Sequence, residues 1–188
     1  MNIGLYFGSF NPIHVGHLII ANFIANKTEL DQVWFVISPQ NPLKTNHNIL
    51  NKLHRKYLID IAIEGEKKLK TSSIEFNLPI PSYTIDTLTY LKEKHPNFTF
   101  TVIMGSDSLQ NISKWKNYEQ LLKNYPVLVY QRPGFAVENT FKNVSVTNAP
   151  MLDVSSSTIR KMIKEGQSIK FLVPDVVKEE IEKNHYYK

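Results

Sequence analysis

Short apolar runs alternate along the chain with longer segments in which apolar positions recur at helical spacing. Strand-like runs occupy Ile3–Phe7, Val33–Ile37, Thr99–Met104 and Val127–Tyr130, with weaker candidates at Ser72–Phe76 and Val144–Thr147. Helical patterns lie between and after these runs, at Val15–Asn26, Asn51–Glu64, Tyr83–Lys94, Tyr118–Lys123, Ser156–Glu165 and Pro174–Asn184. This alternation predicts an α/β fold with a mainly parallel sheet, helices on both of its faces and two helices in the C-terminal part.

The length of the chain favours a single folding unit. Its 188 residues hold no repeat, low-complexity tract or linker, and domains commonly contain roughly 100–200 residues. We therefore expect one domain that spans 1–188. Ligands of parallel sheets bind beyond the carboxyl ends of the strands. Three segments follow predicted strands and should line one cleft, namely Gly8–His17, Ser38–Lys44 and Gly105–Asp107.

The composition is that of an ordinary soluble globular protein, with 42% hydrophobic and 21% charged residues. No N-terminal stretch approaches membrane-spanning length, and no basic-then-apolar leader precedes the first predicted strand. The lack of cysteine excludes disulfides, thiol catalysis and cysteine-based zinc sites. We therefore expect a cytoplasmic protein without a membrane partner.

A net charge of +5 and a pI near 9.2 raise the hypothesis of a nucleic-acid-binding protein. Only three of the 22 basic residues are arginines, however: Arg55, Arg132 and Arg160. The lysines are interspersed with carboxylates, as in Glu64–Lys68, which is typical of a solvated face. A non-catalytic nucleic-acid-binding protein is therefore the weaker alternative, and we expect no nucleic-acid partner.

The segment Gly8–His17 reads G-S-F-N-P-I-H-V-G-H and carries the strongest chemical signal. It joins a predicted strand to a predicted helix, and a helix start attracts phosphate through its unpaired N–H groups and its dipole. The imidazoles of His14 and His17 can donate hydrogen bonds to oxygens whose charge grows during phosphoryl chemistry. Gly8 and Gly16 remove side chains where a ligand or a neighbouring backbone could come close. Dinucleotide and Walker fingerprints are both missing from the sequence.

A second cluster, Ser155–Arg160, opens the penultimate predicted helix. Its four consecutive hydroxyl residues could cap that helix, but a cap needs only one hydroxyl. Arg160 lies one turn further on and can bring its fork of donors to the same anion. Free N–H groups, hydroxyls and a guanidinium at one point favour a pyrophosphate site.

Four further residues each allow a structural and a functional interpretation. Lys44 ends a loop stiffened by two prolines and is either a solvated lysine or a mobile positive charge at the cleft. Asp107, after Gly105, either caps the next helix or binds ribose hydroxyls. Trp115 is either a half-buried packing residue or an aromatic plate for a flat heterocycle. Thr84 either belongs to the first turn of a helix or points into the cleft.

The first segment resembles the G-[TS]-F-[DN]-P-x-H-x-G-H signature of the nucleotidyltransferase superfamily related to class I aminoacyl-tRNA synthetases. The segment Val154–Arg160 resembles that superfamily's second signature, I-S-S-T-x-I-R. Between and after them stand P-S-Y-T-x-x-T-L, G-S-D-S before a K-W segment, Q-R-P-G and L-V-P-D, in that order. From Met1 to Tyr187 the chain thus resembles the bacterial nicotinate-nucleotide adenylyltransferase family.

The resemblance implies a Rossmann-like nucleotidyltransferase fold and adenylyl transfer from ATP to nicotinate mononucleotide, which yields deamido-NAD and pyrophosphate. It implies Mg²⁺ delivered with ATP, and we expect no metal site built from protein ligands. Catalytic roles carry over to His17, His14 and Arg160, with His17 acting at the α-phosphate. The implied ATP-binding residues are Gly8, Ser9, Phe10, His14, His17, Lys44, Gly105, Asp107, Ser157 and Arg160, and the implied nicotinate-nucleotide-binding residues are Thr84 and Trp115.

The sequence departs from the family pattern at three places. Asn11 replaces the commoner aspartate, Lys116 stands where the family has a second aromatic residue, and the proline-rich loop before Lys44 is shorter. An adenylyltransferase that acts on pantetheine phosphate or on nicotinamide mononucleotide is the nearest alternative enzyme. The sequence does not set the oligomeric state and leaves a homo-oligomer open.

Overall fold

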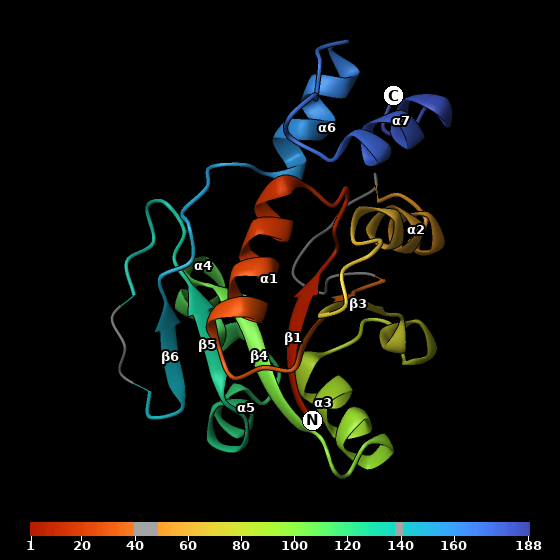
Figure 1. Ribbon diagram of the computed structural model, residues 1–188. Coiled ribbons are helices and arrows are strands. Elements are labelled where there is room, and N and C mark those ends of the chain that lie inside the picture. Colours follow the sequence, from red (N-terminus) through yellow and green to blue (C-terminus); the bar gives the residue numbers. More distant parts are fainter. Residues whose placement is uncertain (40–48, 138–140) are drawn as a thin grey trace.

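The computed structural model describes residues 1–39, 49–137 and 141–188. Its centre is a six-stranded sheet in the order β3-β2-β1-β4-β5-β6, in which every pair of neighbouring strands is parallel (Figure 1). The strands are β1 (Asn2–Gly8), β2 (Gln32–Ile37), β3 (Leu69–Ser72), β4 (Thr99–Gly105), β5 (Val127–Tyr130) and β6 (Val144–Thr147).

The strand order places a topological switch between β1 and β4. The chain runs outward from β1 to β3 on one side, then returns to β4 and continues to β6 on the other side. Loops that leave neighbouring strands in opposite directions open a crevice at the carboxyl ends of those strands. The turn after β1 and the turn after β4 therefore border the expected ligand site.

Helices cover both faces of the sheet (Figure 1). One hydrophobic cluster joins α1, α2, α6 and α7 to the first face, and another joins α3, α4 and α5 to the second. No helix in the described ranges is both long enough and apolar enough to cross a membrane. The helices are α1 (Val15–Lys27), α2 (Lys52–Ala62), α3 (Thr84–Lys94), α4 (Ser106–Gln110), α5 (Tyr118–Asn124), α6 (Ser156–Lys164) and α7 (Asp175–Lys183), with 3-10 turns η1 (Ile74–Asn77) and η2 (Ile112–Lys114).

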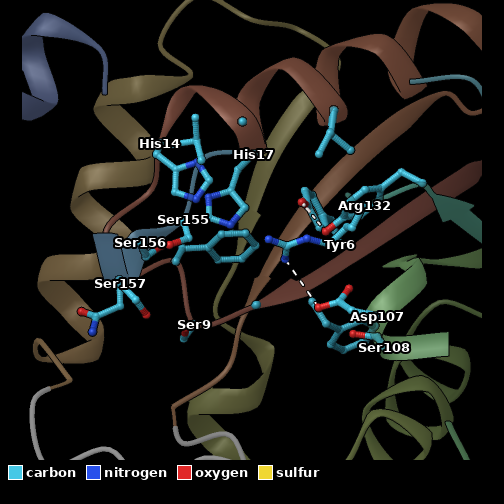
Figure 2. Close-up of a pocket in the computed structure, with 18 of the residues that line it drawn as sticks. Tyr6, Ser9, His14, His17, Asp107, Ser108, Arg132, Ser155, Ser156 and Ser157 are labelled. Atoms are coloured by element: carbon cyan, nitrogen blue, oxygen red, sulfur yellow. Dashed lines mark hydrogen bonds and ion pairs between the residues drawn. The ribbon is translucent and has the colours of Figure 1, made fainter. Parts of the chain in front are cut away.

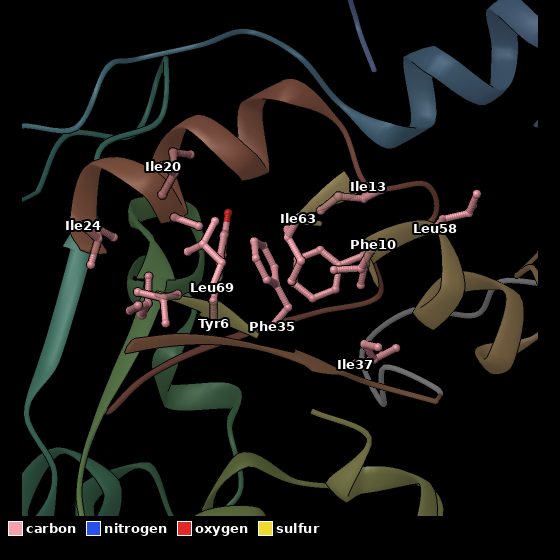
Figure 3. Packing of buried hydrophobic residues seen from close by; sticks show 14 of the residues in the cluster. Tyr6, Phe10, Ile13, Ile20, Ile24, Phe35, Ile37, Leu58, Ile63 and Leu69 are labelled. Carbon is pink, nitrogen blue, oxygen red and sulfur yellow. The ribbon is translucent and has the colours of Figure 1, made fainter. Parts of the chain in front are cut away.

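Alternation along β1 supplies both hydrophobic clusters. Ile3 and Leu5 join the cluster under α3 to α5, whereas Tyr6 joins the cluster under α1. A strand buried on both faces reads as a continuous apolar run, which is why the sequence predicted β1 without a clear period of two. Figure 3 shows Phe10 and Phe35 packed beside Tyr6 between the sheet and α1.

The α/β class, the parallel sheet and the helices on both faces are confirmed. The predicted strand Ser72–Phe76 is wrong, because β3 ends at Ser72 and Ile74–Asn77 forms the 3-10 turn η1. Glu75 explains the turn: it is 2% exposed, and its carboxylate accepts hydrogen bonds from Ser82 (2.6 Å) and Thr87 (2.9 Å). A buried carboxylate needs such donors, and one tight turn brings it to them.

Arg55 of α2 binds the backbone just after the carboxyl ends of β1 and β2. Its side chain is fully buried, and its guanidinium donates to the carbonyl oxygens of Ser9 (2.5 Å), Ser38 (2.9 Å) and Pro39 (3.1 Å), while Nε donates to Leu50 (2.9 Å). Burial lowers the pKa of Arg55 to about 10, which still leaves it charged at neutral pH. Five fixed donors make arginine suited to a site built from carbonyl groups.

We predict that Arg55→Lys lowers the free energy of unfolding by about 3 kcal/mol or more, because a lysine leaves several buried carbonyls without donors. Urea denaturation measures this change. Lys56→Arg is the matched control, since Lys56 pairs with Asp60 at the surface and a surface substitution changes stability by about 0.5 kcal/mol at most. Equal stability of the two variants would contradict the prediction.

Candidate active site

A cavity of about 560 Å³ opens at the carboxyl ends of β1, β4 and β5. The turn after β1 and the start of α6, far apart in sequence, both line it (Figure 2). Its walls come from Tyr6, Phe7, Gly8, Ser9, Phe10, Asn11, His14, Gly16, His17, Ile20, Asp107, Ser108, Asn111, Lys114, Trp115, Tyr130, Gln131, Arg132, Leu152, Val154, Ser155, Ser156, Ser157 and Arg160.

The two glycines of the first motif make room for the chain's own rings. A Cβ at Gly8 would lie 2.8 Å from Cζ of Phe10, and a Cβ at Gly16 would lie 3.1 Å from the ring of His14. The nearest protein atoms to both glycines belong to side chains rather than to a neighbouring backbone, and both glycines also line the cavity. Phe10 has a φ of 45° and is 2% exposed, and its ring packs 5.0 Å from that of His17. Phe10 therefore supports His17 from behind.

His14 and His17 form a stacked pair at the start of α1. Their ring centroids are 3.7 Å apart, with planes inclined by 25°. His14 is only 4% exposed, and Nδ1 of its ring has no hydrogen-bond partner among the described residues. Burial, aided by the charge of Arg132, lowers the pKa of His14 to about 4. His14 is therefore neutral at pH 7 and offers one N–H donor and one acceptor nitrogen.

The hydroxyl residues at the start of α6 have different roles: one caps the helix, and another binds the helix to the turn after β1. Ser155 caps the helix, because its Oγ accepts the backbone N–H of Thr158 at 3.1 Å. Ser156 donates to the carbonyl oxygen of Pro12 at 2.8 Å, which docks α6 on the turn after β1. Ser157 lines the cavity. A single capping serine thus leaves the other hydroxyls for tertiary contacts and for a ligand.

Arg160 joins the two motifs directly. Its Nη1 donates to the carbonyl oxygen of Asn11 at 2.7 Å, and its Nη2 donates to Oγ of Ser157 at 3.3 Å. Arg160 lines the same cavity as His14 and His17. The histidines and the serine–arginine cluster therefore face one cavity, as a common phosphate site requires.

Asp107 and Arg132 form an ion pair on the opposite wall, with 3.5 Å between Oδ2 and Nη1. Gly105 makes this pair possible, since a Cβ there would collide with Asp107 and lie 3.0 Å from Cδ of Arg132. Gly105 itself is the N-cap residue of α4, so the interpretation of Asp107 as the cap is wrong. Both side chains of the pair are about a third exposed, so the pair is weak and can yield to an incoming anion.

The remaining predicted residues take different places. Trp115 is half-buried, packs against the second hydrophobic cluster and lines the cavity. Thr84 is the first residue of α3 and is not among the described lining residues. An ion pair of 2.8 Å between Asp86 of α3 and Lys116 joins that helix to the residue after Trp115. Lys44 lies outside the described residues.

Several lining residues were not singled out as site residues from the sequence, Tyr6 and Tyr130 among them, and Arg132 was noted only as part of the Q-R-P-G motif. A signal for Tyr130 was available, because it ends a predicted strand next to that motif, at the edge where ligands bind. Tyr6 resembles any other apolar residue of its strand, and only the fold shows that its hydroxyl reaches the cavity.

Comparison with known proteins agrees with this geometry. The cytidylyltransferase-like family model matches residues 5–162. A relative from Cytophaga hutchinsonii, named probable nicotinate-nucleotide adenylyltransferase, is 48% identical over 100% of this chain and 98% of its own. Two solved structures of nicotinic acid mononucleotide adenylyltransferase from Plasmodium falciparum, complexed with NaAD and with APC, have TM-scores of 0.87 and 0.83. They are 27% and 26% identical to this chain, and each match covers 99% of this chain and 97% or 96% of the other.

The matched signatures, the sheet topology and the identity over the whole length all lead to one assignment. The chain belongs to the cytidylyltransferase-like family and, within it, to the nicotinate-nucleotide adenylyltransferases.

Proposed function

We propose that the cavity transfers the adenylyl group of ATP to the phosphate of nicotinate mononucleotide, giving deamido-NAD and pyrophosphate. The observation that carries the proposal is the bond from Arg160 to the Asn11 carbonyl, which unites both phosphate motifs on one cavity. The names of the relatives support nicotinate mononucleotide as the acceptor.

The triphosphate end of ATP would lie between the histidine pair and the start of α6. Arg160 supplies guanidinium donors there and Ser157 supplies a hydroxyl, and both suit the β- and γ-phosphates. His14 and His17 supply donors where charge grows on the α-phosphate oxygens. A neutral His14 donates through one N–H without a proton having to be lost first.

The opposite wall offers contacts for the nucleosides. Trp115 presents a half-buried indole on which a pyridine ring can stack. Asp107 provides carboxylate oxygens for ribose hydroxyls, and Arg132 provides positive charge for the phosphate of an acceptor nucleotide. The family resemblance adds two roles to the proposal. Thr84 would contribute to the nicotinate pocket, and Lys44 would contact the triphosphate.

The reaction needs no covalent enzyme intermediate. A phosphate oxygen of nicotinate mononucleotide bonds to the α-phosphorus of ATP, and the bond between that phosphorus and the bridging oxygen to the β-phosphate breaks. Because the attacking phosphate is already an anion, no general base is required. The side chains align the two phosphates and neutralise the charge on the departing pyrophosphate.

Mg²⁺ fits this site as a partner of the phosphates. Among the described lining residues Asp107 is the one acidic side chain, and Arg132 engages it. No group of three or more potential metal ligands occurs in the described part of the chain. Mg²⁺ is commonly held by phosphate oxygens and water, where it neutralises developing charge. In this proposal it arrives with ATP.

Pyrophosphate release from Mg-ATP tests the proposal directly. We expect turnover with nicotinate mononucleotide and little with ATP alone, since the acceptor phosphate is the nucleophile. Nicotinamide mononucleotide and pantetheine phosphate serve as parallel acceptors. A clear preference for either of them would contradict the assigned substrate.

His17→Ala should lower kcat by roughly 100-fold or more, as loss of a transition-state donor does. ATP affinity should change much less, because ground-state contacts to Arg160 and Ser157 persist. Steady-state kinetics and calorimetric titration with ATP measure the two effects. His95→Ala is the matched control, because His95 stacks on Phe98 away from the cavity. A near-normal kcat for His17→Ala would remove His17 from the mechanism.

The lowered pKa of His14 predicts a pH dependence of stability. An unfolded histidine titrates near 6.5 and folded His14 near 4, so the unfolded chain binds more protons between these values. The stability contribution of neutral His14 is complete above pH 6.5 and is lost as the pH falls toward 4. The slope is at most about 1.4 kcal/mol per pH unit. Chemical denaturation at several pH values should show this slope for the wild type and a smaller one for His14→Gln. Equal slopes for the two proteins would be incompatible with a buried neutral imidazole.

A further inference from the structure

Two tyrosine hydroxyls meet on the floor of the cavity. The hydroxyl oxygens of Tyr6 and Tyr130 are 3.1 Å apart, and their rings pack edge to face with centroids 5.8 Å apart. Tyr6 comes from β1 and Tyr130 from the end of β5, so the pair spans β4. Both residues line the cavity, and both are less than 10% exposed (3% and 8%).

The pair has one hydroxyl proton more than its mutual bond uses. Each tyrosine carries a single O–H donor, and Tyr6 donates to Tyr130. No hydrogen bond from Tyr130 to another described side chain competes for its proton, and the residue lines the cavity, so the hydroxyl can donate to a ligand bound there.

The surroundings of the pair define the acceptor. The ring of His17 lies 6.0 Å from that of Tyr6, and the charges of Arg132 and Asp107 both act on the two tyrosines; Figure 2 shows Tyr6 in the part of the cavity where His17 and Arg132 also lie. Burial raises the pKa of both tyrosines above the ordinary value, so the donated proton is present at neutral pH. A neutral donor close to an imidazole and a guanidinium suits an anionic oxygen.

We propose that the hydroxyl of Tyr130, oriented by Tyr6, donates a hydrogen bond to a phosphate oxygen of a bound nucleotide. The inference rests on the proposed function for the identity of the nucleotides, of which two carry such an oxygen: ATP at its α-phosphate and nicotinate mononucleotide at its attacking phosphate. Tyr130 is the donor, and Tyr6 is a positioning residue that acts through it.

Tyr130→Phe tests the donor. We expect kcat/KM for pyrophosphate release to fall roughly ten- to hundredfold, the range for a hydrogen bond to a charged group. A rise in KM for one nucleotide alone identifies that nucleotide's phosphate as the acceptor, and a fall in kcat with unchanged KM places the bond in the transition state. Tyr90→Phe, an exposed tyrosine of α3, removes a hydroxyl elsewhere and should be neutral. A kcat/KM within twofold of wild type for Tyr130→Phe would overturn the proposal.

A double-mutant cycle that combines Tyr6→Phe with Tyr130→Phe tests whether Tyr6 acts through Tyr130. If Tyr6 acts through Tyr130, Tyr6→Phe lowers kcat/KM less than Tyr130→Phe does, and the double variant is no worse than Tyr130→Phe. Additive losses would contradict the positioning role of Tyr6. Thermal unfolding of each variant is measured alongside. If a loss of folded protein accounts fully for the lower activity, the proposal is also overturned.

Calorimetry separates failure of this inference from failure of the proposed function. If wild-type protein does not turn over nicotinate mononucleotide, the proposed function fails. Affinities for Mg-ATP and for nicotinate mononucleotide are then compared between wild type and Tyr130→Phe. A weaker affinity of the variant for either nucleotide still supports the tyrosine donor, whereas equal affinities for both overturn it.

Discussion

Two guanidinium groups donate hydrogen bonds to the turn after β1, and the geometry of the whole candidate site depends on these bonds. Arg55 binds the carbonyl oxygen of Ser9 from beneath, and Arg160 binds that of Asn11 from α6. Hydrogen bonds from a charged donor are stronger than those between neutral groups. A turn fixed in this way keeps His14 at a constant place relative to α6.

Hydrogen bonds to backbone carbonyl oxygens also explain how the short helix α6 can form part of the site for a large ligand. The start of α6 is tied to the turn through Ser156 and Arg160, while Ile159 is fully buried in the first hydrophobic cluster. Ser157 and Arg160 therefore line the cavity, whereas Ile159 faces the core. On the opposite wall, Gly105 leaves the space in which Asp107 and Arg132 approach each other. Rigid backbone on one wall and adjustable side chains on the other suit a site that binds two nucleotides.

Much of the fold followed from hydrophobic periodicity, because strands buried on both faces and helices with apolar stripes leave strong local patterns. The pattern failed at Ser72–Phe76, where a single buried carboxylate, Glu75, bends the chain toward partners that come later in the sequence. No local rule contains that information. The same holds for Tyr6, whose role is set by a hydroxyl contributed from β5.

The candidate site was predictable where motif residues follow strands, and less so elsewhere. His14, His17, Ser157 and Arg160 line one cavity, yet their roles stay predictions by chemistry and resemblance. The closeness of Gly8 to the ring of Phe10 could not be predicted, since a sequence does not show which side chain packs against a glycine. Arg132 was noted as part of the Q-R-P-G motif, but its pairing with Asp107 could not be predicted because the two residues are brought together only by the fold.

The first backbone N–H of α1, on Val15, donates to the carbonyl oxygen of Leu172 at 3.0 Å. The helix that carries His17 is therefore completed by a residue far downstream in the sequence, just as Arg160 reaches back to the turn at Asn11. A ribosome synthesises the histidine motif well before these two stabilising partners. A nascent chain that does not yet contain Arg160 and Leu172 therefore lacks both contacts that hold the turn and the start of α1 in the folded protein.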